Sequence, residues 1–589
     1  MSRFNPPPGP GFAVCAFSYP HSRIREGLAH TLPLDQANLR PISYHVRYMR
    51  LLTAALFSVS CLIAGSGLET LVKIDSGLVA GSGTSVRAYK GIPYAAPPTG
   101  DLRWKAPQPP KPWKGVRVAK TFPNMCPQTV ALITGQPASE DCLGLNVWTP
   151  AHSSAEKLPV MVWIHGGGFQ LGASSQSLYD GEPLASQGVV VVSINYRMGV
   201  FGFFAHPALS KEGVDGNQGL LDMVAALQWV KSNIGQFGGD ANNVTIFGES
   251  AGGTAVCYLM VMPAAQGLFQ KVISESAAWM FNPISHVRES WYGRVPFEQF
   301  AEKQFGDDLA ALRSKSTAEI MKLAGPMDMA GDRADRGEAY MPAVDGVVLP
   351  DDPARLFSSG KFHHVALIAG TNADEGTLLG GPPVRNVAQW NKFAAKQFGP
   401  RMEAAAQVYP VSADADAYDA AVHVNTDYVF LQGTRAVLRA VSQVSPNNTY
   451  QYQFTRVSGV GKRIKWGAFH AAEIPYVFAT LPDSAYGTSA SMIGDLSVRP
   501  DDYTDTDDRL SKAMSGAWVR FARSGDPNGP GLPKWAPFRQ GETYMEFGDR
   551  IEAKHALRKT QLDFMSDFSA WQREHAAALR DTIPVAPGK

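Results

Sequence analysis

The chain has 589 residues, of which 45% are hydrophobic and 10% aromatic, so it can bury a large core and is not a disordered or repetitive protein. Its 54 Lys and Arg residues nearly balance its 53 Asp and Glu residues, and neither sign forms a long run. This balance argues against nucleic acid as a partner, because nucleic-acid binding draws on concentrated positive charge.

The first 66 residues have the pattern of a leader. Residues 1–48 are rich in Pro and Arg without apolar periodicity, and we interpret them as a non-native or disordered extension before a true start at Met49. Residues 49–66 combine a short basic start, an apolar stretch and a zone of small residues, which is the layout of a secretory signal peptide. The apolar stretch is too short for a transmembrane helix. The pattern therefore predicts export to the periplasm or the extracellular space, without a transmembrane anchor.

Cysteines offer a lipid anchor and a disulfide. A lipid anchor on Cys61 is an alternative to a cleaved signal, but Ser58–Ser60 matches the usual leucine-led motif poorly. An exported chain permits disulfides. Cys126 and Cys142 bound a short loop and are predicted to pair, whereas Cys257 falls on an apolar helix and is predicted to be a buried thiol.

Strand and helix patterns alternate through the middle of the chain. Apolar runs typical of buried strands occupy 158–164, 189–194, 244–247 and 365–370, and apolar residues recur at helical spacing over 219–230. Strands interleaved with helices favour an α/β fold whose mostly parallel sheet is covered by helices on both faces. Catalytic residues of such a fold lie at the carboxyl ends of the strands, so they are expected in the segments that follow each strand.

A His-Gly-Gly-Gly segment, residues 165–168, follows the first of these strands. Three glycines let the backbone point consecutive N–H groups at one place, and this form is associated with the oxyanion hole of lipases and esterases. The segment therefore predicts Gly166 and Gly167 as donors to a developing negative charge. The alternative is a flexible glycine turn.

The segment 247–253, Phe-Gly-Glu-Ser-Ala-Gly-Gly, fits the G-x-S-x-G nucleophile elbow, in which a strand turns sharply into a helix. Gly248 and Gly252 flank the serine because so tight a reversal leaves no room for a Cβ, and either glycine can require a positive φ. The pattern predicts Ser250 as nucleophile and the Ala251 N–H as a third oxyanion donor. A match this short does not by itself exclude a glycine-rich loop.

Two neighbouring acids, Asp374 and Glu375, follow the strand that ends at Gly370. They fall at the right place in the chain order serine, acid, histidine that is typical of this class of triad. Adjacent side chains in an extended segment point to opposite sides, so only one of the two can face the site. The residues themselves do not decide which one.

The catalytic base is expected among the histidines that follow these acids. His423 lies in an alanine-rich stretch that is typical of a helix, and His555 and His575 lie among charged residues near the C-terminus, where a solvated face is the default. His470 lies in a loop, 467–475, that is bounded by glycine and proline. Because loops carry catalytic residues disproportionately, we predict His470 as the base.

Together these segments resemble the type-B carboxylesterase and cholinesterase family of α/β hydrolases, over about residues 77–547. Such a fold has a large, mostly parallel sheet with cap and gorge insertions, which we place at 276–360 and 380–465. We expect a single domain over 67–575 and a tail at 576–589. Further markers of the family occur at Tyr89–Pro98, Glu140–Trp148, Asn195–Arg197, Gly216–Asn217, Phe237–Asp240 and Gly525–Asn528.

The resemblance implies hydrolysis of small carboxylic esters through an acyl-enzyme, with Ser250 as nucleophile, His470 as base and Glu375, rather than Asp374, as acid. It implies no metal and no organic cofactor. A lipase or an amide or carbamate hydrolase with the same machinery is an alternative. A noncatalytic adhesion or binding module is a further one, since some members of the family have lost the elbow serine.

The resemblance also implies structural pairings. In cholinesterases the disulfide loop is longer and carries a tryptophan that holds the choline cation by cation–π attraction, whereas residues 127–141 contain no aromatic residue. A choline ester is therefore not the expected substrate. The implied pairings are the disulfide Cys126–Cys142 and the buried ion pairs Arg103–Glu140 and Arg197–Asp222, which we interpret as structural.

Overall fold

The computed structural model describes residues 70–128, 136–213, 216–282, 284–290, 295–325, 340–481 and 498–575. The predicted leader, 1–66, and the predicted tail, 576–589, lie outside the described residues. The chain divides into two units, Met1–Ser66 and Gly67–Lys589, and all described elements belong to the second.

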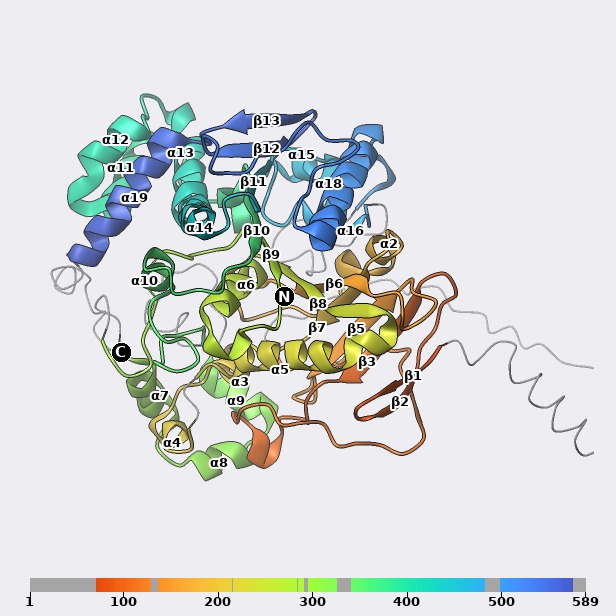
Figure 1. Ribbon diagram of the computed structural model, residues 1–589. Helices are drawn as coiled ribbons and strands as arrows, with labels where there is room; N and C mark the ends of the chain where they lie inside the picture. The colour runs from red at the N-terminus through yellow and green to blue at the C-terminus, as the bar shows by residue number, and fades with distance from the viewer. Residues whose placement is uncertain are drawn as a thin grey trace, which may run out of the picture. The chain divides into compact units, whose positions relative to one another are not determined.

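A ten-stranded sheet lies at the centre of the second unit (Figure 1). The strand order is β13-β12-β11-β10-β9-β8-β6-β7-β5-β3. All neighbours from β7 to β12 run parallel, and only the outer pairs β3–β5, β5–β7 and β12–β13 are antiparallel. This confirms the mostly parallel sheet of an α/β hydrolase. The strands are β3 Arg87–Pro93, β5 Gly144–Thr149, β6 Leu158–Ile164, β7 Val190–Ile194, β8 Gly239–Glu249, β9 Lys271–Glu275, β10 Ala366–Asn372, β11 Thr449–Phe454, β12 Thr543–Phe547 and β13 Ile551–His555.

The strands expected from apolar runs occupy the middle of this sheet. β6 has the predicted bounds, and β7 and β10 differ from them by only one or two residues at either end. β8 is longer than predicted at both ends, and residues 240–243, near its start, are partly buried or exposed and lie at a register shift against β6. Apolar periodicity marks only the part of a strand that both faces of the sheet bury.

Helices cover both faces of the sheet, as the alternation of elements predicted. Successive β6 side chains alternate between two hydrophobic cores. Val160 and Val162 pack on the side of α5 and α6, whereas Met161 and Trp163 pack on the side of α16 and α18. The predicted helix over 219–230 lies within α5. These covering helices are α5 Gln218–Asn233, α6 Ala251–Val261, α16 Ile474–Phe478 and α18 Asp505–Ser524.

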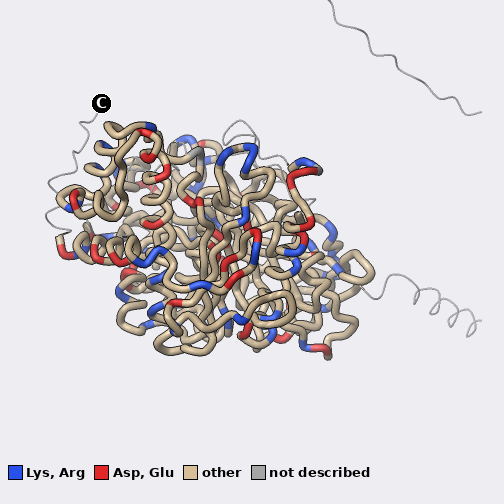
Figure 2. The backbone as a smooth tube through the Cα atoms, turned by 90° about the horizontal axis from the view of Figure 1, so that it is seen from above, with Lys and Arg blue, Asp and Glu red and all other residues tan. Residues whose placement is uncertain are grey.

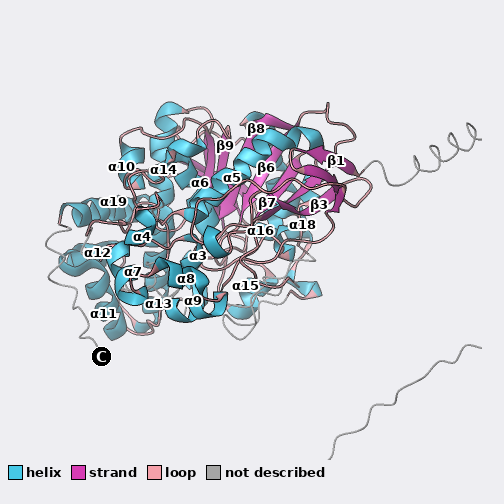
Figure 3. Ribbon diagram, turned by 90° about the horizontal axis from the view of Figure 1, so that it is seen from below, coloured by secondary structure: helices cyan, strands magenta, loops and turns pink. Residues whose placement is uncertain are grey.

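Of the segments expected to form the cap and gorge, 380–465 is mainly helical but also contains β11, a strand of the central sheet, whereas 276–360 carries only the short helices α7 to α10 among its described residues. α11, α12 and α13 share a hydrophobic core with the C-terminal α19, and these four helices gather on the side of the unit away from β1 and β3 (Figures 1 and 3). β1 (Leu71–Ile74), β2 (Gly77–Ala80) and β4 (Val116–Val118) form a separate small sheet. The remaining helices are α2 Glu182–Ala185, α3 Gly199–Gly202, α4 Pro207–Ser210, α7 Phe297–Phe305, α8 Leu309–Ser314, α9 Thr317–Ala324, α10 Pro353–Ser358, α11 Val387–Phe398, α12 Met402–Val408, α13 Asp414–Asn425, α14 Gln432–Val444, α15 Gly459–Ile464 and α19 Lys559–Glu574.

Basic and acidic positions are interspersed along the chain rather than separated by sign (Figure 2). Both implied ion pairs are present and buried. Arg103 lies 2.6 Å from Glu140, and Arg197 lies 2.7 Å from Asp222. Removing one partner of such a pair leaves a buried charge unpaired and destabilises the fold by about 3–5 kcal/mol.

Within the described ranges, no helix combines the length and the apolar character needed to cross a membrane.

The predicted state of the three remaining cysteines is confirmed. Cys126 and Cys142 form a disulfide, with Cα atoms 5.1 Å apart. Their sequence separation is 16 residues, and closing a loop of that length stabilises a fold by about 3 kcal/mol on the chain-entropy model. Cys257 is buried, and burial raises the pKa of its thiol to about 12, so the thiol stays protonated and unreactive at neutral pH.

Candidate active site

Ser250 lies at the turn from β8 into α6, and the backbone strain of the elbow falls on this residue. Its φ is 58° and its ψ is −122°, a conformation that residues with a side chain rarely adopt. The expectation that Gly248 or Gly252 can require a positive φ is wrong, since neither has one. Space is what requires them: a Cβ would lie 2.5 Å from the Ile164 carbonyl oxygen at Gly248 and 2.0 Å from it at Gly252. Ser250 itself is only partly buried.

Neighbouring strands hold the elbow in place. The Ser250 N–H donates to the Glu275 carbonyl at the end of β9, at 2.9 Å. The Ser250 carbonyl accepts the Thr254 N–H at 2.8 Å, which starts α6. Gly253 also packs against β9, since a Cβ there would lie 2.3 Å from the Glu275 carbonyl oxygen. The strained turn is therefore fixed by β6 on one side and by β9 on the other.

The glycine segment after β6 borders the elbow. A Cβ on Gly166 would lie 2.8 Å from Glu249 Oε2 and 3.0 Å from the Ser250 Cβ. Gly167 has a φ of 107°, and a Cβ there would lie 2.0 Å from the Leu171 carbonyl oxygen. Gly166 therefore lies against Ser250, Gly167 follows it in the chain, and Ala251 follows Ser250 directly.

The buried side chain of His165 packs against the glycine segment. The ring is fully buried, stacks on Tyr196 with centroids 4.6 Å apart, and places Nδ1 2.9 Å from the Gly166 carbonyl oxygen. Burial lowers the pKa of His165 to about 4, so its imidazole is neutral at neutral pH. A Cβ on Gly172 would meet the ring at 2.2 Å. This histidine therefore shapes the turn by packing.

His470 and Glu375 are in direct contact, with Nδ1 2.5 Å from Oε2. Glu375 is fully buried, and its Oε1 accepts the Asn372 N–H at 2.7 Å. Asp374 points elsewhere, because its Oδ2 accepts the Ala468 N–H at 2.7 Å. Of the two neighbouring acids, Glu375 therefore faces the histidine, while Asp374 holds the loop that carries it.

The other candidate histidines lie on other elements. His423 lies within α13, the helix expected for it, and is partly buried. His555 ends β13, where Nδ1 lies 3.0 Å from Thr543 Oγ1. His575 is exposed just after α19.

Glu249 is a residue of the site to which the sequence assigned no role. It precedes Ser250, and its Oε1 lies 3.1 Å from His470 Nε2, on the side of the ring opposite Glu375. Burial raises the pKa of Glu249, and the negative charges of Glu473 and Glu375 raise it further, while protonated His470 opposes them. Its position inside the elbow motif was the one available signal.

Two more buried carboxylates adjoin the site. Glu473 accepts Asn372 Nδ2–H at 2.5 Å and the Ser276 hydroxyl at 3.3 Å, and burial raises its pKa. Glu275 accepts the Trp518 indole N–H at 2.8 Å, and burial raises its pKa as well. So many neighbouring carboxylates cannot all ionise in a buried site, so some of them hold protons at neutral pH.

The charge of His470 depends on these carboxylates. Burial alone lowers its pKa, but the negative charges of Glu249 and Glu375 outweigh burial and raise the pKa to about 9. When Glu249 takes up a proton, it loses its negative charge and the pKa of His470 falls. His470 Nε2 is then unprotonated and can accept a proton from another group. The two groups therefore titrate as a pair.

Aromatic side chains border the histidine and were not singled out from the sequence. Phe430 lies in a π-helix, Thr426–Leu431, and its ring centroid is 4.9 Å from that of His470. π-Helical turns are rare and concentrate at functional sites. The backbone N–H of Trp279, whose side chain is exposed, donates to the Val429 carbonyl of the same π-helix at 2.7 Å.

The chain is similar to known esterases over most of its length. The sequence profile of the Carboxylesterase family matches residues 69–565. Fumonisin B1 esterase of Sphingopyxis macrogoltabida is 37% identical over 490 residues, covering 82% of this chain and 87% of that protein. Para-nitrobenzyl esterase of Bacillus subtilis (strain 168) is 38% identical over 452 residues, covering 75% of this chain and 87% of that protein. A solved PNB esterase superposes with a TM-score of 0.68 at 33% identity and covers 84% of this chain and 100% of its own.

We expect Gly252→Ala to destabilise the protein by several kcal/mol, because the new Cβ would overlap the Ile164 carbonyl oxygen and backbone cannot move as a side chain can. Gly235→Ala is the matched control, since a Cβ at Gly235 meets nothing within 4 Å. Urea unfolding of both variants measures the difference. Equal stability of the two would show that the elbow tolerates a side chain at this position.

Proposed function

Because this carboxylic ester hydrolase belongs to the carboxylesterase family, we propose that it cleaves small esters through an acyl-enzyme on Ser250, with His470 as base and Glu375 as its acid partner. The observation that carries the proposal is the contact of Glu375 with Nδ1 of His470, which leaves Nε2 on the side of the elbow. This is the arrangement that a serine nucleophile requires of its base.

In the first half of the reaction, Ser250 Oγ attacks the ester carbonyl and His470 Nε2 takes the hydroxyl proton. Glu375 holds the ring in the tautomer with its proton on Nδ1 and stabilises the positive charge that forms. N–H groups of Gly166, Gly167 and Ala251 donate to the oxyanion of the tetrahedral intermediate. The intermediate collapses, and the alcohol leaves with the proton from His470.

In the second half, water attacks the acyl carbon while His470 takes a proton from it. The second tetrahedral intermediate releases the carboxylic acid, and Ser250 regains its proton from His470. No redox change and no co-reactant other than water are needed. Glu249 tunes this cycle, since its protonation state sets how readily His470 Nε2 gives up its proton.

Aromatic residues near the histidine favour esters with an apolar or aryl group. Phe430 offers apolar surface beside the proposed catalytic histidine, and Trp279, which is bonded through its backbone to the same π-helix, is exposed. The name of the Bacillus subtilis relative, para-nitrobenzyl esterase, points to the same class of substrate. We therefore propose small aryl or apolar esters as preferred substrates.

Export from the cytoplasm is a second part of the proposal. The pattern of residues 49–66 and the disulfide Cys126–Cys142 both suit an oxidising compartment. We expect N-terminal sequencing of secreted protein to begin after the apolar stretch. Secreted protein that retained residues before Ser60 would contradict a cleaved signal peptide.

Ser250→Ala should lower the turnover of a short-chain nitrophenyl ester by several orders of magnitude, as loss of the nucleophile costs about a million-fold in a comparable triad. His470→Gln should cost nearly as much, because nucleophile and base act as one unit. Labelling by a fluorophosphonate should be lost with Ser250→Ala and retained in the control Ser524→Ala, whose serine is exposed. Near-normal turnover by either active-site variant would overturn the assignment of that residue.

Glu249→Gln should shift the acidic limb of the pH profile of kcat/KM to lower pH. Removing a negative charge beside protonated His470 lowers the pKa of the imidazole, and the base acts only when Nε2 is unprotonated, so activity should persist to lower pH. The control Glu182→Gln replaces an exposed glutamate and should leave the profile unchanged. A limb that stayed in place or moved to higher pH in Glu249→Gln would argue against the tuning role.

A further inference from the structure

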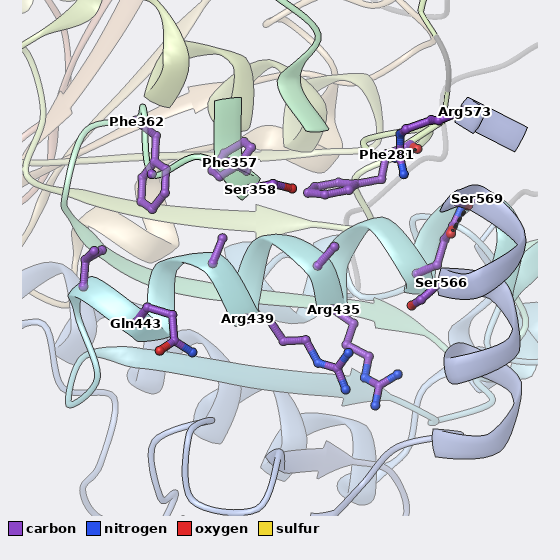
Figure 4. Close-up of a pocket in the computed structure, with 15 residues that line it drawn as sticks. Phe281, Phe357, Ser358, Phe362, Arg435, Arg439, Gln443, Ser566, Ser569 and Arg573 are labelled. Carbon is purple, nitrogen blue, oxygen red and sulfur yellow. Dashed lines mark hydrogen bonds between the residues drawn. The ribbon is translucent and has the colours of Figure 1, made fainter. Parts of the chain in front are cut away.

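A groove of about 490 Å³ lies on the outer side of α14, between α10 and α19 (Figure 4). None of its lining residues is one of the proposed catalytic or oxyanion residues. Its volume is within the range of small-molecule sites in proteins. The groove is therefore a candidate binding site apart from the catalytic centre.

One wall of the groove is apolar. Phe281, Phe357 and Phe362 extend toward α14 from the same side (Figure 4), and the ring centroids of Phe357 and Phe362 are 5.1 Å apart. Across from them α14 presents the small side chains of Ala436 and Ala440. Small residues facing aromatic ones leave a slot that suits a hydrocarbon chain.

The other wall is cationic. Arg435 and Arg439 extend from α14 on the side away from the phenylalanines (Figure 4). Arg573, near the end of α19, instead lies beside Phe281, to whose carbonyl it donates at 2.7 Å. None of the residues that line the groove is acidic. The groove therefore joins an apolar slot to an edge of guanidinium groups.

The neighbouring carboxylates, Glu542 and Asp563, are too few to neutralise the cations that they contact. Glu542 accepts from both Arg435 Nε, at 2.9 Å, and Arg439 Nε, at 2.8 Å. Asp563 accepts from Arg435 Nη1 at 2.8 Å and is shared with Lys559. Cations thus outnumber the carboxylates that they contact.

Arg435 lacks a hydrogen-bond partner for one of its guanidinium nitrogens. Its side chain is 2% exposed, yet Nη2 is buried without a hydrogen-bond partner among the described residues. A buried guanidinium N–H without an acceptor is costly, and a ligand that supplies an anionic oxygen removes that cost.

We propose that the groove binds an amphipathic carboxylate, with its hydrocarbon chain between the phenylalanines and the alanines of α14 and its carboxylate on Arg435 and Arg439. The shape and the charge of the groove select for the two halves of such a molecule. A neutral alcohol of the same length lacks the oxygen charge that the arginines require, and an alkylammonium ion is repelled by them.

Calorimetric titration of the full-length protein with decanoate and with decanol tests this proposal. The protein is first inactivated with a long-chain alkyl fluorophosphonate, so that decanoate does not enter the catalytic pocket. We expect decanoate to bind about tenfold more tightly than decanol, and the difference to shrink as salt is added. Equal affinity for the two compounds would overturn the proposal.

Variants place the binding in the groove. Ala440→Trp fills the slot and should abolish decanoate binding, whereas Arg439→Gln should weaken it by about threefold to tenfold and leave decanol unaffected. Arg439 is 46% exposed, so Arg439→Gln remains informative if Ala440→Trp does not fold. Arg117→Gln, on exposed β4, is the matched control and should bind as wild type. Wild-type affinity in folded Ala440→Trp, or in Arg439→Gln, would place decanoate elsewhere and refute the site.

Discussion

The position of the His470 imidazole between two carboxylates is the interaction on which the rest of the site depends. Glu375 contacts Nδ1 at 2.5 Å, and Glu249 contacts Nε2 at 3.1 Å. Glu249 is adjacent to Ser250, so the histidine that approaches Glu249 necessarily lies beside the elbow. The three side chains of the proposed triad come from β8, from the end of β10 and from a loop before α16. The sheet brings them together, because β8, β9 and β10 are consecutive parallel neighbours whose carboxyl ends share one edge.

Strain and close packing at the elbow follow from the same geometry. Ser250 is held at a positive φ because Gly248 and Gly252 lie against the end of β6 and Gly253 lies against β9, leaving the chain no wider path. Such a conformation persists only when the surrounding structure over-determines it, and here two strands of the sheet do so. The glycines are therefore required because neighbouring backbone leaves no room for a Cβ, while Ser250 takes the unfavourable backbone conformation and stays partly exposed.

Burying several ionised carboxylates around one base is unfavourable in free energy. Hydrogen bonds to the carboxylates and protons bound within the cluster reduce this unfavourable term. Asn372 donates its backbone N–H to Glu375 and its side-chain amide to Glu473, so one residue serves two acids. Trp518 of α18 donates its indole N–H to Glu275. With burial raising the pKa of Glu249, Glu275 and Glu473, the cluster can hold protons that His470 then need not carry. The groove on α14 has an excess of positive rather than negative charge, since cationic side chains there outnumber the carboxylates that they contact.

The sequence by itself predicted the fold class and the central strands, because these depend on apolar runs, and it predicted the disulfide because its two cysteines bound a short loop. Glycines at a tight turn and the order of serine, acid and histidine along the chain pointed to the proposed site. The sequence did not decide between Asp374 and Glu375 without a family resemblance, since the choice depends on which way each side chain leaves the turn after β10. It also missed Glu249, Glu473 and Phe430. Glu249 and Phe430 are distant from His470 in the chain and lie beside it only in the folded protein. Glu473 is close to His470 in the chain, but the burial that raises its pKa exists only once the helices and the sheet have packed. Sequence motifs therefore predict which residues take part in the chemistry, whereas the pKa values of these residues and the shape of the pockets depend on the tertiary structure.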